Sequence, residues 1–138
     1  MAVAADIHRE AFAAWNKRDF KKMRELMHPD YRYTGGDGKE AVGPDAGVAI
    51  GQMYAAAFPD GQVEVERVHV AGDTAVAEVV ARGTHGGDLM GIAPTGKKVE
   101  IRICNVVELR DGKVYREREY MDTLVMMVQL GAVKLPGS

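Results

Sequence analysis

The carboxyl group of Asp122 stands in an apolar part of the sequence, where an ionisable side chain needs an explanation. Tyr120 and Met121 precede it, an apolar run begins at Leu124, and no Lys or Arg lies within three residues on either side. In an apolar pocket, desolvation raises the pKa of a carboxyl group from about 3.9 toward neutrality, which suits a general acid/base. Aspartate before an apolar-periodic run is also a standard helix N-cap, so both roles stay open at this point.

Asn105 is the polar exception on an otherwise apolar strand face. From Val99 to Leu109, all odd-numbered positions except 105 are apolar. A buried amide costs free energy unless it is hydrogen-bonded. Asn105 therefore either satisfies a neighbouring backbone group or faces a cavity and orients a ligand carbonyl. The opposite face, which carries Arg102 and Cys104, suits a partly covered outer surface such as a dimer contact.

His85 lies in a glycine-rich connection between Thr84 and Gly86. A histidine there is often solvated, but it can also contact a ligand. The sequence holds no H-E-x-x-H motif, no cysteine cluster and no close spacing of histidines and acids, so we expect no metal and no cofactor.

Length, charge and cysteine content limit the class of protein. A chain of 138 residues suggests one domain over 1–138. A formal net charge of -2 argues against a nucleic-acid partner, and no apolar run approaches the ~20 residues that cross a bilayer. Cys104 is the single cysteine, so an intrachain disulfide is excluded and a cytoplasmic location is the default.

Hydrophobic periodicity and turn residues predict helices first and strands afterwards. The expected elements are helices over 5–27, with a break near 16–19, and over 48–58, a short strand over 31–34, strands over 63–70, 74–82, 98–109 and 114–121, and a short helix over 123–130. The fold class is therefore α+β, with a curved antiparallel sheet wrapped around N-terminal helices. Such an arrangement leaves a conical central pocket for a small ligand.

The side-chain parity of the last strand decides which residues face that pocket. Val114 is expected to be buried and shares its parity with Tyr120 and Asp122 if the strand has no bulge. Arg116 and Arg118 share this parity too, so a bulge or a mixed lining must be allowed. The run "REREY" is otherwise typical of a solvated strand face.

Four motifs in this order, GTHGG at 83–87, APTGK at 93–97, DGK at 111–113 and D-x6-QLG at 122–131, resemble the SnoaL-like polyketide cyclase family within the NTF2-like α+β barrels. The resemblance implies a cone-shaped barrel with a deep apolar cavity. It also implies an aspartate as general acid/base, matched here by Asp122, and a pocket histidine, matched by His85. Where aromatic polyketide cyclases of the family have a histidine on the penultimate strand, this chain has Asn105.

The resemblance implies an intramolecular aldol condensation without a cofactor. Asp122 would remove a C–H proton from a small apolar, polyketide-like carbonyl substrate, and Asn105 and His85 would hydrogen-bond its oxygens. The expected partners are this ligand and a second copy of the chain in a homodimer or higher homo-oligomer. The residues expected to bind the substrate are Trp15, Tyr33, Met53, Phe58, Met90, Ile103 and Tyr120.

Four other functions remain open, one of which is a pure interaction module whose dimer face is the functional surface. Epoxide hydrolysis on this scaffold would use an Asp-Arg-Asp set, but Arg102 lies on the face opposite Asn105 and positions 103 and 105 are not acids. Double-bond isomerisation would need a tyrosine donor and two buried acids, and only one candidate acid is evident. A non-catalytic binding protein would use Asp122 as a helix cap alone.

Overall fold

The structure, a computed structural model, describes residues 3–137. The elements in chain order are α1 (Val3–Asn16), α2 (Phe20–Glu25), β1 (Met27–Thr34), β2 (Glu40–Val42), α3 (Pro44–Ala57), β3 (Gln62–Ala71), β4 (Thr74–Thr84), β5 (Lys98–Arg110), β6 (Lys113–Met121) and α4 (Thr123–Gln129). Within these residues no helix has the length and apolar character that crossing a membrane requires.

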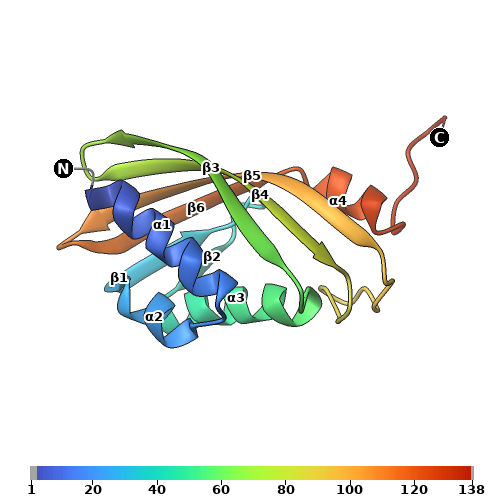
Figure 1. Cartoon of the computed structure of the whole chain (residues 1–138), viewed down its shortest axis with the longest axis horizontal. Helices are drawn as coiled ribbons and strands as arrows, with labels where there is room; N and C mark the ends of the chain where they lie inside the picture. Colours follow the sequence, from blue (N-terminus) through green and yellow to red (C-terminus); the bar gives the residue numbers. More distant parts are fainter. Residues whose placement is uncertain (1–2, 138) are drawn as a thin grey trace.

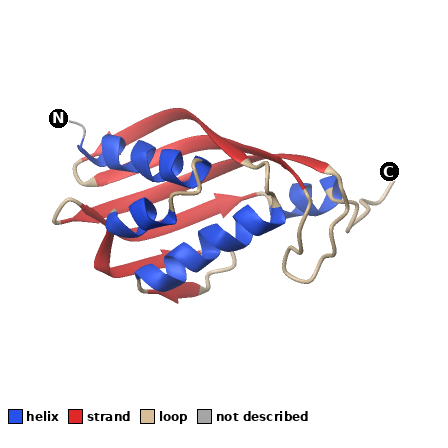
Figure 2. Cartoon of the chain, turned by 60° about the horizontal axis from the view of Figure 1, so that its bottom comes forward, coloured by secondary structure: helices blue, strands red, loops and turns tan. Residues whose placement is uncertain are grey.

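The strands form one curved sheet, in the order β2-β1-β6-β5-β4-β3. Figure 2 shows α1, α2 and α3 across one face of the sheet, while α4 lies near its end. In Figure 1 the long strands β3 to β6 run over α1 and carry the curvature. The α+β architecture predicted from the sequence is confirmed, with one difference in strand direction.

That difference is the pairing of β1 with β6, which is parallel, whereas every other neighbouring pair is antiparallel. Tight hairpins impose the antiparallel direction on the pairs β3–β4 and β5–β6, since the turns after Ala71 and Arg110 hold only two residues. The β4–β5 pair is also antiparallel, although the longer segment 85–97 joins these two strands. No hairpin joins β1 to β6, so their direction follows from packing. The sequence prediction of an antiparallel sheet therefore holds for every neighbouring pair except β1 and β6.

Strand β1 starts earlier than the pattern predicts, at Met27 instead of position 31. Its pairing with β6 is interrupted between Met27 and Arg32, and Pro29 falls in this gap. A proline fits there because it has no N–H to donate to a ladder. The short β2 was expected to be loop; it pairs with β1 through a turn in which Gly38 has a φ of 81°.

One extra residue in β6 sets the face on which its side chains lie. Leu109 pairs with Val114, but Glu108 pairs with Arg116, which leaves Tyr115 as an inserted residue. A bulge of one residue reverses the alternation beyond it. Val114 remains buried. After Tyr115, the odd-numbered residues of β6 face the side on which Val114 lies, whereas in a regular strand the even-numbered ones would.

The buried apolar side chains form two clusters. One contains Met27, Tyr31 and Val114, and the other contains Phe58 and Met126. All five side chains also line one cavity, which therefore extends between the two clusters under the helices.

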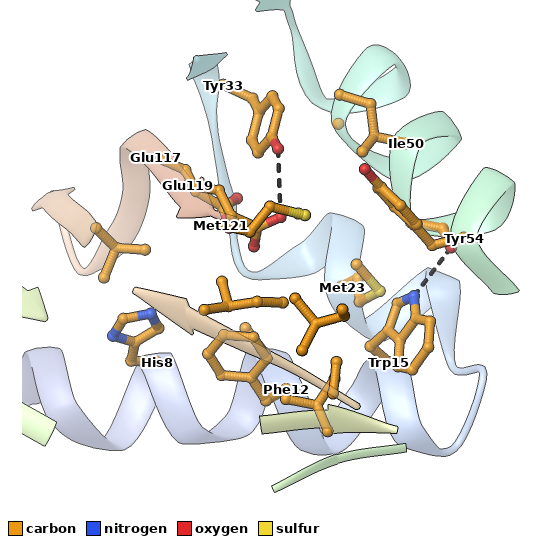
Figure 3. A pocket seen from close by; sticks show the side chains of 18 of the residues that line it. His8, Phe12, Trp15, Met23, Tyr33, Ile50, Tyr54, Glu117, Glu119 and Met121 are labelled. Carbon is orange, nitrogen blue, oxygen red and sulfur yellow. Dashed lines mark hydrogen bonds between the residues drawn. The ribbon is translucent and has the colours of Figure 1, made fainter. Parts of the chain in front are cut away.

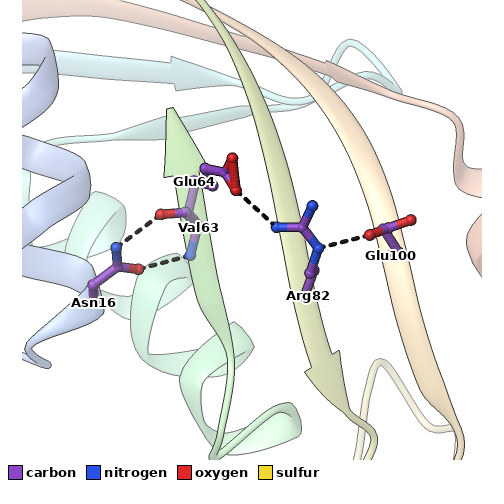
Figure 4. A network of polar contacts seen from close by, with 5 residues as sticks. All are labelled: Asn16, Val63, Glu64, Arg82 and Glu100. Atoms are coloured by element: carbon purple, nitrogen blue, oxygen red, sulfur yellow. Dashed lines mark hydrogen bonds and ion pairs between the residues drawn. The ribbon is translucent and has the colours of Figure 1, made fainter. Parts of the chain in front are cut away.

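Two amide side chains attach helices to strands. Asn16, at the end of α1, donates to the Val63 carbonyl oxygen and accepts from the Val63 N–H, both at 2.8 Å (Figure 4). Gln129 does the same to Glu100 at 2.8 and 3.1 Å, and so holds α4 against β5. The glutamine of the QLG motif thus has a structural role, because each amide satisfies both backbone groups of one strand residue.

Candidate active site

The cavity between the helices and the sheet has a volume of about 170 Å³. A single water needs roughly 10–15 Å³ by the same measure, so the space suits a small organic ligand. Apolar and aromatic side chains form most of the wall, including Phe12, Trp15 and Phe58. Its titratable side chains are His8, Tyr31, Tyr33, Tyr54, Arg82, Glu117 and Glu119.

Glu117 and Glu119 place two carboxyl groups at this cavity. They lie opposite Val107 and Asn105 on β5, and opposite residues of a ladder share a face of the sheet. Val107 is 2% exposed and Asn105 is 0% exposed, which identifies this face as the inner one. The bulge at Tyr115 therefore turns both glutamates inward, and Figure 3 shows their carboxyl groups side by side.

Asn105 joins the two carboxyl groups through a single amide. Its Nδ2 lies 2.8 Å from Glu117 Oε2 and 2.9 Å from Glu119 Oε2. Each of its two N–H groups thus meets a different acid. On the other side, Asn105 Oδ1 lies 2.7 Å from Nε2 of His8 on α1. Asn105 is buried and fully hydrogen-bonded, which explains a polar residue on an apolar strand face.

Two tyrosines of β1 donate to the acids with unequal strength. The Tyr31 hydroxyl lies 2.5 Å from Glu117 Oε1, and the Tyr33 hydroxyl lies 3.4 Å from Glu119 Oε1. Burial raises the pKa of both tyrosines, and the glutamates raise it further, so both remain neutral donors. The bond of Tyr31 is short and fixed, whereas that of Tyr33 is long enough for its proton to turn toward a ligand.

Glu119 has the properties of a general acid/base at neutral pH. Burial, and secondarily the charge of Glu117, raise its pKa to about 7, against the lowering effect of the hydrogen bonds from Asn105 and Tyr33. Both protonation states of Glu119 are then populated near neutral pH, the condition under which a carboxyl group both takes and returns a proton.

The described lining residues offer the acid pair no free cation. Among the described residues that line the cavity, Arg82 is the only lysine or arginine. Its guanidinium lies 2.6 Å from Glu100 Oε1 and 3.1 Å from Glu64 Oε2 (Figure 4). Within residues 3–137 no group of three or more His, Cys, Asp or Glu side chains is placed to hold a metal ion.

Asp122 lies outside the cavity, contrary to the parity expected for an unbulged strand. It is exposed, and its Oδ1 accepts the Val125 N–H at 3.0 Å, which makes it the N-cap of α4. It borders a shallow depression that also includes Tyr120, Arg102 and Cys104. The physical reason is the inserted Tyr115, which places Tyr120 and Asp122 on the outer side.

The other expected site residues divide between the cavity and elsewhere. Trp15, Tyr33, Phe58 and Ile103 line the cavity, whereas Met53, Met90 and Tyr120 do not. Met90 is 58% and Tyr120 52% exposed.

His85 is fully buried outside the cavity, and it joins the GTHGG and APTGK motifs. Its Nδ1 accepts from the Thr95 N–H at 3.2 Å and lies 3.0 Å from Thr95 Oγ1. In the structure His85 contacts this loop and Phe58, at 5.7 Å between ring centroids, and it is not brought together with Asn105.

Sequence reasoning missed the two glutamates, Tyr31 and His8. The mismatch between buried Val114 and the charged Arg116 and Arg118 was the available indication, since a single bulge resolves it and turns Glu117 and Glu119 inward. Tyr31 and His8 had no comparable indication, because an aromatic in a strand and a histidine in a helix are usual core residues.

The comparisons with known proteins agree on one family. A family model described as SnoaL-like polyketide cyclase matches residues 5–130. The aklanonic acid methyl ester cyclase DnrD of Streptomyces peucetius is 26% identical over 135 residues, which cover 95% of this chain and 92% of the relative. The nogalonic acid methyl ester cyclase of Streptomyces nogalater is 26% identical over 121 residues, 86% and 90% of the two chains.

Solved structures show the same fold. TsrD of Streptomyces laurentii has a TM-score of 0.86 at 25% identity, covering 96% of this chain and 97% of its own. AclR of Streptomyces galilaeus, described as a candidate hydroxylase, has a TM-score of 0.86 at 28% identity, covering 99% and 87%. Since proteins with different described activities share this fold, the reaction has to be argued from the site.

Proposed function

Because the chain belongs to the SnoaL-like polyketide cyclase family, we propose that it closes a ring in a small, largely apolar carbonyl substrate by an intramolecular aldol condensation without a cofactor. Glu119 is the general base and acid of this reaction. The observation that carries the proposal is a carboxyl group with a pKa of about 7 in an apolar cavity. The relatives that are named as methyl ester cyclases support the substrate class.

The first step is removal of a proton from a carbon between two carbonyl groups of the substrate. The ionised Glu119 carboxylate takes this proton and becomes neutral, and the electron pair of the C–H bond becomes an enolate. Protonation of Glu119 also removes the repulsion from Glu117 that contributes to its raised pKa. The apolar wall excludes water and so strengthens the electrostatic interactions between Glu119 and the substrate.

The enolate oxygen needs hydrogen-bond donors. The Tyr33 hydroxyl, held only loosely at 3.4 Å from Glu119, is one candidate. Tyr54 of α3 also lines the cavity, and burial raises the pKa of its hydroxyl, so it stays a donor. Figure 3 shows both hydroxyl groups on the same side of the cavity. Preorganised donors of this kind stabilise developing negative charge.

In the second step the enolate carbon attacks a ketone carbon of the same molecule, a C–C bond forms, and the carbonyl π electrons move to oxygen. The neutral Glu119 returns its proton to this alkoxide, so no net proton is gained or lost. Confinement in the cavity holds the two carbons close together, which replaces a bimolecular encounter.

A pair of near-isosteric substitutions tests which carboxyl group is the base. Glu119→Gln should lower kcat for a cyclisable β-dicarbonyl substrate by about 100-fold or more, whereas Asp122→Asn, which still caps a helix, should leave it nearly unchanged. Loss of activity in Asp122→Asn with retention in Glu119→Gln would restore the assignment that the family resemblance suggested.

Double-bond isomerisation is a second candidate, favoured by one observation. The sequence offered a single candidate acid for it, but the structure has two, Glu117 and Glu119, each with a tyrosine donor. The same proton transfer on a β,γ-unsaturated ketone would give a dienolate, which Glu119 could protonate at the γ carbon. The absorbance of the conjugated product measures this activity directly, and Glu119→Gln is its control.

A homodimer through the outer face of β5 stays a prediction, which sedimentation equilibrium would test. A non-catalytic binding function is the outcome if ligands stabilise the protein in thermal melts but no substrate is turned over.

A further inference from the structure

We infer that His8 is a positioning residue for the acid pair: it donates a hydrogen bond to Asn105 and so fixes the amide that aims one N–H at each of Glu117 and Glu119. The effect of His8 on catalysis rests on the function proposed above. The geometry of the His8–Asn105 hydrogen bond does not depend on that function.

The contact joins the first helix to the penultimate strand inside the protein. His8 is 1% exposed and Asn105 is 0% exposed, and the two residues are 97 positions apart in the chain. The Nε2–Oδ1 distance is 2.7 Å, short for a neutral N–H···O bond. His8 Nδ1 has no partner among the described residues, so this bond is the one polar contact that the His8 ring makes there.

The hydrogen-bonding capacity of Asn105 fixes the tautomer of His8. An asparagine amide has two N–H donors and one carbonyl acceptor. Both donors meet carboxyl groups, at 2.8 and 2.9 Å, so Oδ1 must accept and His8 Nε2 must carry a proton. Burial lowers the pKa of His8 below its usual value, so the ring stays neutral and Nδ1 carries only a lone pair.

This bond opposes the alternative orientation of Asn105. A flipped amide would turn Oδ1 toward two carboxyl groups, with repulsion in place of two hydrogen bonds, and Nδ2 toward His8. His8 could then accept this N–H only by moving its ring proton to Nδ1, where the buried N–H would have no acceptor among the described residues. A donor at position 8 therefore selects the orientation in which Asn105 draws Glu117 and Glu119 together.

The orientation of Asn105 matters for Glu119 because the Asn105 hydrogen bond works against the effects of burial and of Glu117. A loosened amide would leave Glu119 protonated up to a higher pH, and the base would be less available at neutral pH. The polar groups that act on Glu119, from its own strand and from the elements packed against it, are Glu117, Asn105, Tyr33, Tyr31 and Tyr54. His8 lies one contact further away, bonded to Asn105.

A purely structural role for His8 predicts different behaviour. The ring stacks on Phe12 of the same helix at 5.3 Å between centroids, and an apolar ring would keep this contact. If packing alone matters, His8→Phe should preserve activity at every pH. If positioning matters, His8→Phe should lower activity at low pH more than at high pH. His8→Gln, which supplies an amide N–H as a replacement donor, should restore activity.

The experiment compares the wild-type protein, His8→Phe and His8→Gln in pH profiles of kcat/KM on a cyclisable β-dicarbonyl substrate. The kcat/KM of His8→Phe should be about tenfold below wild type at pH 6 and less than about twofold below it at pH 9. The kcat/KM of His8→Gln should lie within about twofold of wild type at every pH. Equal losses in both variants at all pH values, or no loss in His8→Phe, would overturn the proposal.

Two NMR measurements test the same inference without a substrate. In the wild-type protein at neutral pH, the ¹⁵N shifts of the His8 ring, assigned against His8→Gln, should show a protonated Nε2 and an unprotonated Nδ1. The Glu119 carboxyl ¹³C shift should titrate at a higher pH in His8→Phe than in His8→Gln. The Nδ1–H tautomer, or identical titrations, would sink the inference, whereas absence of turnover alone would count against the proposed function.

Discussion

Asn105 and Glu119 face each other across β5 and β6, and the Asn105 amide nitrogen lies 2.9 Å from Glu119 Oε2. Glu119 reaches this inner face, and with it the cavity, because β6 contains an extra residue at Tyr115. Asp122, the acid that the sequence suggested as general acid/base, lies three positions after Glu119 and caps α4 on the outer side. Strand register thus decides which carboxyl groups reach the cavity.

Removal of the Asp122 carboxyl group should reduce stability and leave the chemistry intact. Asp122→Ala removes the acceptor for the Val125 N–H, and loss of an N-cap costs about 1 kcal/mol. Asp122→Asn should cost much less. Urea denaturation of both variants measures the difference, and the pH profile of kcat/KM should match wild type in each. An altered pH profile in Asp122→Asn would place Asp122 in the catalytic machinery.

The pKa of Glu119 predicts the pH dependence of activity. Since the base must be ionised, kcat/KM should rise with pH through an apparent pKa of about 7 and level off above it. A fall of kcat/KM across this range would mean that the neutral acid is the form required in the free enzyme, and that a different group takes the proton.

The same group links stability to pH. The folded-state pKa of Glu119, about 7, exceeds its ordinary value of 4.5, so the folded protein binds more protons between these two pH values. The free energy of unfolding should therefore fall as pH rises from about 4.5 to about 7, and Glu119→Gln should lack this component. Urea titrations of both proteins at several pH values measure it. If the free energy of unfolding had the same pH dependence in both proteins, the pKa of Glu119 would not be raised in the folded state.

The overall architecture followed from sequence patterns because strong local features specify it. Alternation from Val99 to Leu109, the break between the strands predicted over 98–109 and 114–121, and the short helix predicted over 123–130 are all found in the structure. The two residues in that break, Asp111 and Gly112, have positive φ values of 53° and 73°, which aspartate and glycine tolerate in a hairpin turn. These elements depend on neighbours within a few residues, which a single sequence reveals.

The site was less predictable because it depends on contacts between distant residues. Nothing local in "REREY" distinguishes a solvated face from a pair of inward glutamates, since a shift of one residue exchanges the two faces. The His8 contact with Asn105 spans 97 positions and has no local pattern. Asn105 itself was identified, because it interrupts a regular strand whose parity was clear.

Substitution of Tyr31 should mainly lower stability, whereas substitution of Tyr33 should mainly lower catalytic rate, although the two residues lie two positions apart on β1. Tyr31→Phe removes the 2.5 Å bond to Glu117, and loss of a hydrogen bond to a charged group costs roughly 1.5–3 kcal/mol. Tyr33→Phe removes only a 3.4 Å contact in the unliganded protein, so its unfolding energy should change little. As a donor to the enolate, Tyr33 should instead lower kcat, by about tenfold or more.

Thermal or urea unfolding and steady-state kinetics on both variants measure these effects. A large stability loss in Tyr33→Phe with unchanged kcat would remove Tyr33 from the mechanism and leave Tyr54 as the donor to examine.

The charge of the cavity should select neutral ligands over anionic ones. Glu117 and Glu119 both face the cavity, and the single cation among the described lining residues, Arg82, is engaged by Glu64 and Glu100. A ligand carboxylate about 6 Å from one ionised glutamate would be disfavoured by roughly 3 kcal/mol at an effective dielectric constant near 20. An ester should therefore bind about 100-fold more tightly than its free acid at pH 8.

Calorimetric titration with an ester and its acid of the same carbon skeleton measures this preference, and Glu119→Gln is the matched control. Because protonation of Glu119 removes one negative charge, the preference for the ester should weaken at pH 6 in the wild-type protein. In Glu119→Gln the preference should be smaller at pH 8 and should change little between these pH values. Equal affinities of ester and acid at pH 8 would mean that the bound ligand keeps its charged end away from the acid pair.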